Sequence, residues 1–231
     1  MPVAAITMRR KHTRRIMYDL PPTVRWRKAL GVDGKRPPLL VLLHGRGADE
    51  HDLFALTPAI DSAIAVASVR APLPTDEGGY TWSESRSPGR YIGESLRASL
   101  TWFQEWLDSL ASGRLEPQEV YLLGFSAGMA MASALVLDQP HRYAGVVLLS
   151  GALPFDTDLP ITKNRLAGAR VLYGHGSFDR VIPAGLVARS AKYLRESSGA
   201  ELESRSYPIA HEISDAEMAD INAWLAEGPS R

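Results

Sequence analysis

The hydrophobic positions along the chain follow two alternating patterns. Some short runs are almost continuously apolar, which is typical of strands buried on both faces of a parallel sheet. These runs cover residues 39–43, 65–69, 120–125, 146–149 and 170–173. Between them, apolar residues recur every three or four positions, as they do from Leu96 to Leu110, which indicates helices with one buried face. Strands that alternate with helices predict an α/β fold with a mostly parallel central sheet and helices on both of its faces.

Weaker signals complete the expected order of elements. Further helices are expected over residues 127–137, 186–194 and 218–225. The last of these follows a stretch from Ser214 to Glu217 that has the form of a capping box. A sixth strand is expected at 202–207, and the less regular segment 16–26 is expected to supply antiparallel edge strands. Residues 72–93 form the one long irregular stretch, and loops of that length usually carry function.

Composition narrows the class of protein. The 231 residues suit one domain over residues 16–231, preceded by a basic tail at residues 1–15 that lacks the order of a secretory signal. The 26 basic and 26 acidic residues balance, so no net field favours nucleic acid, and no apolar run is long enough to span a membrane. The absence of cysteine excludes disulfides, thiolate metal sites and a cysteine nucleophile. We expect a cytoplasmic protein, with a monomer and a homodimer both open.

A serine between two glycines marks the expected junction of a strand and a helix. Ser126 lies in the sequence Gly124-Phe-Ser-Ala-Gly128, directly after the run 120–125 and before the helix-forming segment 127–137. Such a turn exposes the serine hydroxyl at the carboxyl end of the sheet, and glycines allow strand and helix to pack closely. The pattern therefore predicts a nucleophile at Ser126 rather than an ordinary loop serine.

A serine nucleophile needs a histidine base, and the order of the chain selects one. Of the six histidines, His141, His175 and His211 follow Ser126. His141 lies in a helix-to-strand connection at the other end of the sheet, and His175 precedes the best candidate acid. His211 follows the expected strand at 202–207 and precedes the last helix, which is where this kind of fold places its base.

Three aspartates could orient that base. Asp179 lies in a glycine-rich turn directly after a strand, which can project its carboxylate toward His211, and we favour it. Asp156 and Asp158 lie in what resembles a surface loop and stay open as alternatives.

The loop after the first buried strand is expected to complete the site. Gly45 and Gly47 leave room for a substrate, so the backbone N–H of Arg46 is expected to stabilise an oxyanion together with that of Ala127 at the helix start. The Arg46 side chain is equally compatible with exposure to solvent and with binding of a carboxylate. The acidic residues 49–52 fit a solvated helix start capped by Asp49 or Asp52 better than a metal site.

Four motifs together resemble the phospholipase/carboxylesterase family of α/β-hydrolases, over about residues 38–225. They are the stretch from Leu42 to Glu50 (LLHGRGADE), the serine motif GFSAG, the sequence HGSFDRVIP from His175 to Pro183, and His211-Glu-Ile. The family includes acyl-protein thioesterases and small carboxylesterases. The chain departs from it in carrying Ala127 where acyl-protein thioesterases usually have glutamine, and Ala210 where a glycine commonly precedes the base.

The resemblance implies a carboxylesterase without metal or cofactor that hydrolyses small-molecule esters of short to medium acyl chains. Ser126, His211 and Asp179 would act as nucleophile, base and acid, with an acyl-enzyme intermediate. Residues 151–169 are too short for a large lid, so the site is expected to be open. Tyr80, Trp82 and Met129 are expected to contact the acyl chain. A thioesterase or lysophospholipase, and a non-catalytic binding protein on the same fold, stay as alternatives.

Overall fold

A mostly parallel sheet of seven strands forms the centre of the molecule, in the order β1-β3-β2-β8-β9-β10-β11. The computed structural model describes residues 18, 21–31, 36–111 and 117–228, so the predicted tail at 1–15 lies outside the described residues. The strands are β1 (Val24–Arg27), β2 (Leu39–Leu43), β3 (Ala65–Val69), β8 (Val120–Phe125), β9 (Gly145–Leu149), β10 (Arg170–Gly176) and β11 (Glu201–Tyr207). β1 pairs antiparallel with β3 and the other neighbours are parallel, which confirms the predicted sheet and the antiparallel edge.

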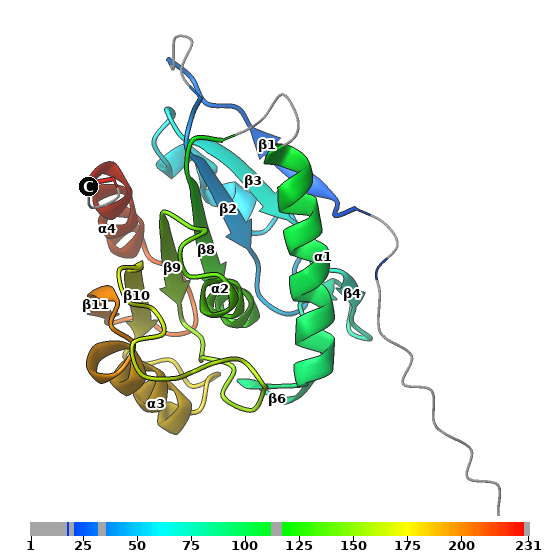
Figure 1. Ribbon diagram of the computed structural model, residues 1–231, viewed down its shortest axis with the longest axis vertical. Coiled ribbons are helices and arrows are strands. Elements are labelled where there is room, and N and C mark those ends of the chain that lie inside the picture. Colours follow the sequence, from blue (N-terminus) through cyan, green and yellow to red (C-terminus); the bar gives the residue numbers. More distant parts are fainter. Residues whose placement is uncertain (1–17, 19–20, 32–35, 112–116, 229–231) are drawn as a thin grey trace, which may run out of the picture.

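Helices cover both faces of the sheet. The apolar cluster on one face joins α1 (Gly93–Ala111), α2 (Ala127–Asp138) and α3 (Ala184–Glu196) to alternate strand residues such as Val41. The cluster on the other face joins the 3₁₀ helix η1 (Leu53–Ala59) and α4 (Asp215–Ala226) to the intervening ones, such as Leu42. Figure 1 shows α4 across the sheet from α1, α2 and α3. Among the helices of the described residues, none combines the length and the apolarity needed to cross a membrane.

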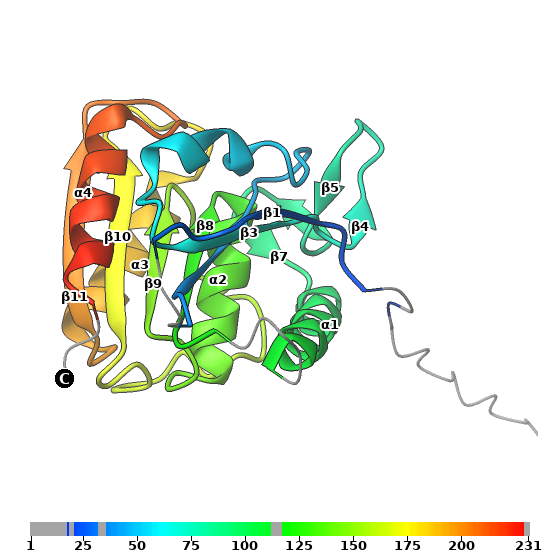
Figure 2. The ribbon, with the colours of Figure 1, turned by 90° about the horizontal axis from the view of Figure 1, so that it is seen from above.

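The long segment at 72–93 is more ordered than its sequence suggests. It contains two small hairpins, one of β4 (Leu73–Pro74) and β5 (Tyr80–Thr81) and one of β6 (Ser85–Ser87) and β7 (Arg90–Tyr91). Figure 2 shows β4 and β5 projecting from the body of the molecule. By contrast, residues 151–169 between β9 and β10 contain neither helix nor strand, so no helical lid is built there.

Two expected helix caps differ from the prediction. The Ser214 hydroxyl accepts a hydrogen bond from the Glu217 N–H at 3.2 Å, but the Glu217 side chain turns into the interior instead of completing the capping box. The helix after the acidic residues is the 3₁₀ helix η1, and its N-cap, Asp52, makes no side-chain cap bond. Asp49 accepts instead from the N–H of His51 at 2.9 Å. The proline at position 58 inside η1 lacks the N–H that a regular α-helix would need there.

Candidate active site

Ser126 stands on a strained turn between β8 and α2. Its backbone has φ 57° and ψ −115°, in the left-handed region that residues other than glycine rarely adopt. The turn is tight because α2 passes close to the sheet: a Cβ at Gly128 would lie 1.8 Å from the carbonyl oxygen of Leu43, and one at Gly124 would lie 2.2 Å from that of Gly128. The two glycines of the serine motif therefore permit the contact that lifts the Ser126 hydroxyl above the strand ends.

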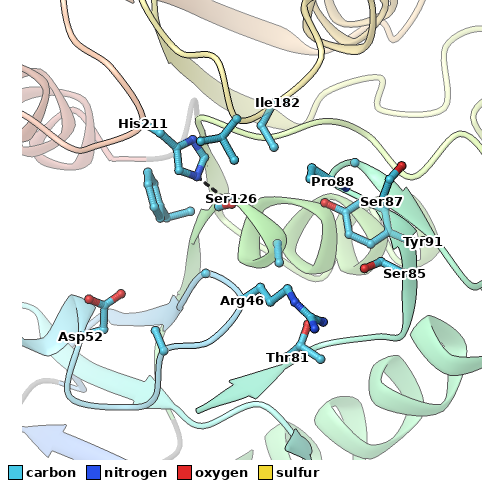
Figure 3. Close-up of a pocket in the computed structure, with 16 residues that line it drawn as sticks. Arg46, Asp52, Thr81, Ser85, Ser87, Pro88, Tyr91, Ser126, Ile182 and His211 are labelled. Carbon is cyan, nitrogen blue, oxygen red and sulfur yellow. Dashed lines mark hydrogen bonds between the residues drawn. The ribbon is translucent and has the colours of Figure 1, made fainter. Parts of the chain in front are cut away.

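His211 joins Ser126 to Asp179 through its two ring nitrogens. Nε2 lies 3.0 Å from the Ser126 Oγ, and Nδ1 lies 2.8 Å from the Asp179 Oδ2 (Figure 3 shows the contact with Ser126). The Asp179 side chain is 4% exposed and that of His211 is 19% exposed. The carboxylate fixes the proton on Nδ1, so Nε2 is left with a lone pair toward the serine hydroxyl.

Backbone contacts hold the histidine loop against the aspartate loop. The N–H groups of Ser177 and Phe178 donate to the carbonyl oxygens of Tyr207 and Ile209, at 2.7 and 3.0 Å. The ring of Phe125 packs on that of His211 with 4.9 Å between centroids. The position of the base is thus set by β8, β10 and β11 together.

The alternative acids lie elsewhere. Asp156 accepts from Arg90 at 2.9 and 3.0 Å, and Asp158 accepts from Arg97 at 3.1 Å. Both belong to surface ion pairs, and neither contacts His211. The geometry therefore leaves Asp179 as the partner of the base.

His44, a buried histidine, controls the loop that carries Arg46. Burial lowers the pKa of His44, which favours a neutral ring. Its Nε2 accepts from the N–H of Ala71 at 3.1 Å, so Nδ1 carries the proton and donates to the carbonyl oxygen of Gly45 at 2.7 Å. In a trans peptide the carbonyl and the next N–H point in opposite directions, so the N–H of Arg46 points away from His44. No described group accepts a hydrogen bond from it.

Tyr80 belongs to the frame of this loop rather than to its substrate wall. Its backbone exchanges hydrogen bonds with the N–H of Gly47 and the carbonyl of Ala48, at 2.9 and 2.8 Å. Its ring lies under the guanidinium of Arg70. That guanidinium also donates two hydrogen bonds to the buried carboxylate of Glu50, at 2.5 and 2.6 Å. These hydrogen bonds from Arg70 lower the pKa of Glu50.

The same ion pair bears on the acidic residues 49–52. Asp49, Glu50 and His51 offer ligand atoms within 4.8 Å of one another. Both oxygens of Glu50 are already bound by Arg70, however, and a metal ion would have to displace that guanidinium. This arrangement fits a structural ion pair better than a metal site.

A cavity of about 540 Å³ opens beside Ser126. The predicted loop at 72–93 forms much of its wall, but not through the predicted residues. Trp82 is 1% exposed and donates its indole N–H to the carbonyl of His44 at 2.8 Å, and Met129 is fully buried in the core. Neither these two nor Tyr80 lines the cavity, so the expected acyl contacts are corrected. The side chains that line it include Thr81, Ser85, Ser87, Tyr91, Val181 and Ile182.

The sequence did not single out these lining residues, because a short strand turns alternate side chains to opposite sides. In β5 and the residue after it, Thr81 faces the cavity and Trp82 the core. Large aromatic residues were expected to form the wall, but the largest of them, Trp82, is buried in the core. The available signal was the run of hydroxyl residues at 81–87, which a buried apolar wall would not need.

Comparisons with known proteins show which proteins this chain is similar to. Acyl-protein thioesterase 1 of Kluyveromyces lactis is 28% identical over 225 residues, which cover 86% of this chain and 96% of that protein. A probable carboxylesterase SOBER1-like of Arabidopsis thaliana is 30% identical over 125 residues. The chain spans about half the length of this protein and of several other curated relatives that it matches (47%, 45% and 52%).

Solved structures show the same fold. The carboxylesterase from Mesorhizobium loti superimposes with a TM-score of 0.75 at 29% identity, covering 91% of this chain and 97% of that one. The Bacillus cereus carboxylesterase gives 0.76 at 22% identity, covering 89% and 94%. The sequence model of one family, described as phospholipase/carboxylesterase, matches residues 32–227. With the match extending over most of its length, the chain belongs to the phospholipase/carboxylesterase family of α/β-hydrolases.

Proposed function

We propose that this protein is a serine carboxylesterase that hydrolyses small esters of short to medium acyl chains. The observation that carries the proposal is the continuous hydrogen-bonded path from the Ser126 Oγ through His211 to Asp179, with steps of 3.0 and 2.8 Å. That path ends in an open cavity beside Ser126, where an ester can reach the hydroxyl.

The first half of the reaction transfers the acyl group to the enzyme. His211 Nε2 takes the proton of Ser126 as Oγ attacks the carbonyl carbon, and the carbonyl oxygen becomes an oxyanion. The N–H groups of Arg46 and Ala127 donate to that oxyanion, each stabilising the transition state by about 3 kcal/mol. When the intermediate collapses, the bond to the alcohol oxygen breaks, and the imidazolium of His211 returns its proton to that oxygen.

The second half repeats these steps with water. His211 removes a proton from water as its oxygen attacks the acyl-enzyme, and the bond to Ser126 Oγ breaks. The proton returns to Ser126, and the acid leaves. Asp179 stays ionised throughout and stabilises the imidazolium that forms in each half.

A fluorophosphonate probe and a chromogenic short-chain ester test the proposal. Ser126→Ala should lose labelling and turnover and keep its thermal midpoint, whereas Ser62→Ala, an exposed serine before β3, should keep both activities. Ester hydrolysis that survives in Ser126→Ala would end the proposal. Absence of labelling and turnover in the folded wild-type protein would instead favour a binding protein on this fold.

Thioester hydrolysis is a second candidate, because a protein named acyl-protein thioesterase matches this chain over almost its whole length. Methyl butyrate and S-methyl thiobutyrate form a matched pair that differs in the leaving atom. We expect the ratio of kcat/KM for the oxygen ester to kcat/KM for the thioester to exceed the ratio of their rates of uncatalysed hydrolysis. A preference for sulfur beyond that reactivity would assign the thioesterase activity instead.

A further inference from the structure

The two sides of the cavity differ in chemistry, and the catalytic residues tell which side receives which half of an ester. His211 must protonate the leaving alcohol, so the alcohol lies on the His211 side of Ser126 and the acyl group on the other. Figure 3 shows Ser85, Ser87 and Tyr91 on that other side, across Ser126 from His211. The acyl side is therefore lined by hydroxyl groups, whereas an alkyl chain would be bound better by apolar side chains.

The hydroxyl of Tyr91 is the strongest signal on this side. The residue is 5% exposed and lines the cavity, and Figure 3 shows its hydroxyl directed into that space. No described residue hydrogen-bonds to this hydroxyl, and burial raises the pKa of Tyr91, so the hydroxyl keeps its proton. The hydroxyl oxygen is open to the cavity, where a polar atom of a ligand can accept a hydrogen bond from it in place of water.

Arg46 supplies a positive charge to the same side. Its side chain lines the cavity, and Figure 3 shows it extended toward Thr81, away from Asp52. Its partner is Glu77, at 3.2 Å, and both side chains are well exposed (47% and 76%). An exposed pair of this kind is weak, so a carboxylate that entered the cavity could replace Glu77 as the partner of Arg46.

The charges around the cavity also select an orientation. Arg46 and Asp52 are the basic and acidic side chains that line the cavity besides His211, and they lie on different sides in Figure 3. A negative group is repelled from the Asp52 side and attracted to the side that holds Arg46 and Tyr91. A guanidinium and a phenol donor together suit a carboxylate better than an uncharged hydroxyl.

We propose that the acyl side of this site binds a short acyl group that ends in a carboxylate, so that the preferred substrates are half-esters of small dicarboxylic acids, held by the Tyr91 hydroxyl and the Arg46 guanidinium. This rests on the proposed esterase function and names the substrate class of the same site. Arg46 then serves twice, through its N–H at the oxyanion and through its side chain at the far end of the acyl group.

Steady-state hydrolysis of a small set of esters tests this assignment. Monomethyl succinate carries the carboxylate on the acyl side, dimethyl succinate and methyl butyrate carry none, and acetoxyacetate carries it on the alcohol side. The wild-type protein should hydrolyse monomethyl succinate with kcat/KM at least about tenfold above each of the other three, with the difference mainly in KM, since a hydrogen bond to a charged group corresponds to at least a tenfold effect.

Two variants and a matched control locate the preference. Tyr91→Phe and Arg46→Met, which keeps the backbone N–H, should each lower the ratio of monomethyl succinate to methyl butyrate hydrolysis about tenfold, with the thermal midpoint measured alongside. Glu77→Gln removes the competing partner of Arg46 and should lower KM for monomethyl succinate about twofold.

Equal or faster hydrolysis of the uncharged esters by the wild-type protein would overturn the assignment, as would variants that slow all esters equally. In both cases hydrolysis that depends on Ser126 would leave the esterase function standing. Failure of every ester, with no probe labelling, would instead remove the esterase function on which this assignment rests.

Discussion

Glu217 offers a direct test of how burial governs the stability of this protein. It lies on α4, is 1% exposed, and a Cβ at Gly174 of β10 would lie 2.4 Å from its Oε1. Neither carboxyl oxygen has a hydrogen-bond partner among the described residues. Burial raises the pKa of Glu217 from 4.5 to about 7; the backbone of Ser214 opposes this shift, and the negative charge of Asp220 adds a smaller contribution to it.

The raised pKa fixes the sign and the size of the effect on stability. Well below pH 4.5 the carboxyl is protonated in both the folded and the unfolded chain. Between pH 4.5 and about 7 the unfolded chain loses the proton first, so the free energy of unfolding falls as the pH rises. Each pKa unit corresponds to about 1.4 kcal/mol, so ionised Glu217 costs about 3 kcal/mol above pH 7. Glu217→Gln removes the ionisation and should recover that amount.

Urea unfolding of the wild-type protein and of Glu217→Gln, at pH 4.5, 6 and 8.5, measures this contribution. The difference in free energy of unfolding should be close to zero at pH 4.5 and should grow to about 3 kcal/mol in favour of the variant at pH 8.5. Other groups titrate in the wild-type protein and in the variant alike, so their effect on the free energy of unfolding cancels in this difference. Glu105→Gln, an exposed glutamate on α1, is the matched control and should show little difference at any pH. A Glu217→Gln difference that does not change with pH would refute the reasoning.

Three further changes test the site. Gly128→Ala places a methyl group 1.8 Å from the carbonyl oxygen of Leu43, so it should abolish esterase activity and lower stability by several kcal/mol, measured by turnover and thermal unfolding. His44→Asn shortens the side chain that holds the Gly45 carbonyl, so kcat should fall about 100-fold while KM for a short ester changes little; an unchanged kcat would show that the Arg46 N–H is positioned without it. Asp179→Asn should lower kcat about 10⁴-fold and Asp156→Asn less than twofold, and the reverse order would reassign the acid.

The elements of this fold were predictable because their physical causes are local. A short run that is apolar at every position has no polar side to face water, which predicts a strand covered on both faces. β2 and β9 are such runs, and both are buried at every position. The same reasoning brought Ser126, Asp179 and His211 together: each lies in the turn or loop that follows a strand, and parallel strands place such residues at one edge of the sheet.

The cavity wall could not be predicted, because it depends on contacts between distant segments. The buried Trp82 donates a hydrogen bond to the carbonyl of His44, which lies 38 residues earlier. The Glu50–Arg70 pair that braces Tyr80 joins residues 20 apart. In both cases, the sequence around one residue contains no pattern that predicts its contact with the other. The segment at 72–93 was therefore correctly expected beside the cavity, but its two hairpins and the orientation of its side chains were not predicted.

The wide spacing of the three catalytic candidates along the chain has a consequence for folding. The hydrogen bond between Ser126 and His211 joins residues 85 apart, and that between Asp179 and His211 joins residues 32 apart. They meet only after β8, β9, β10 and β11 have paired side by side, and contacts between distant segments form slowly. Recovery of activity after dilution from denaturant therefore reports the assembly of this half of the sheet, and helix formation seen by circular dichroism will precede it.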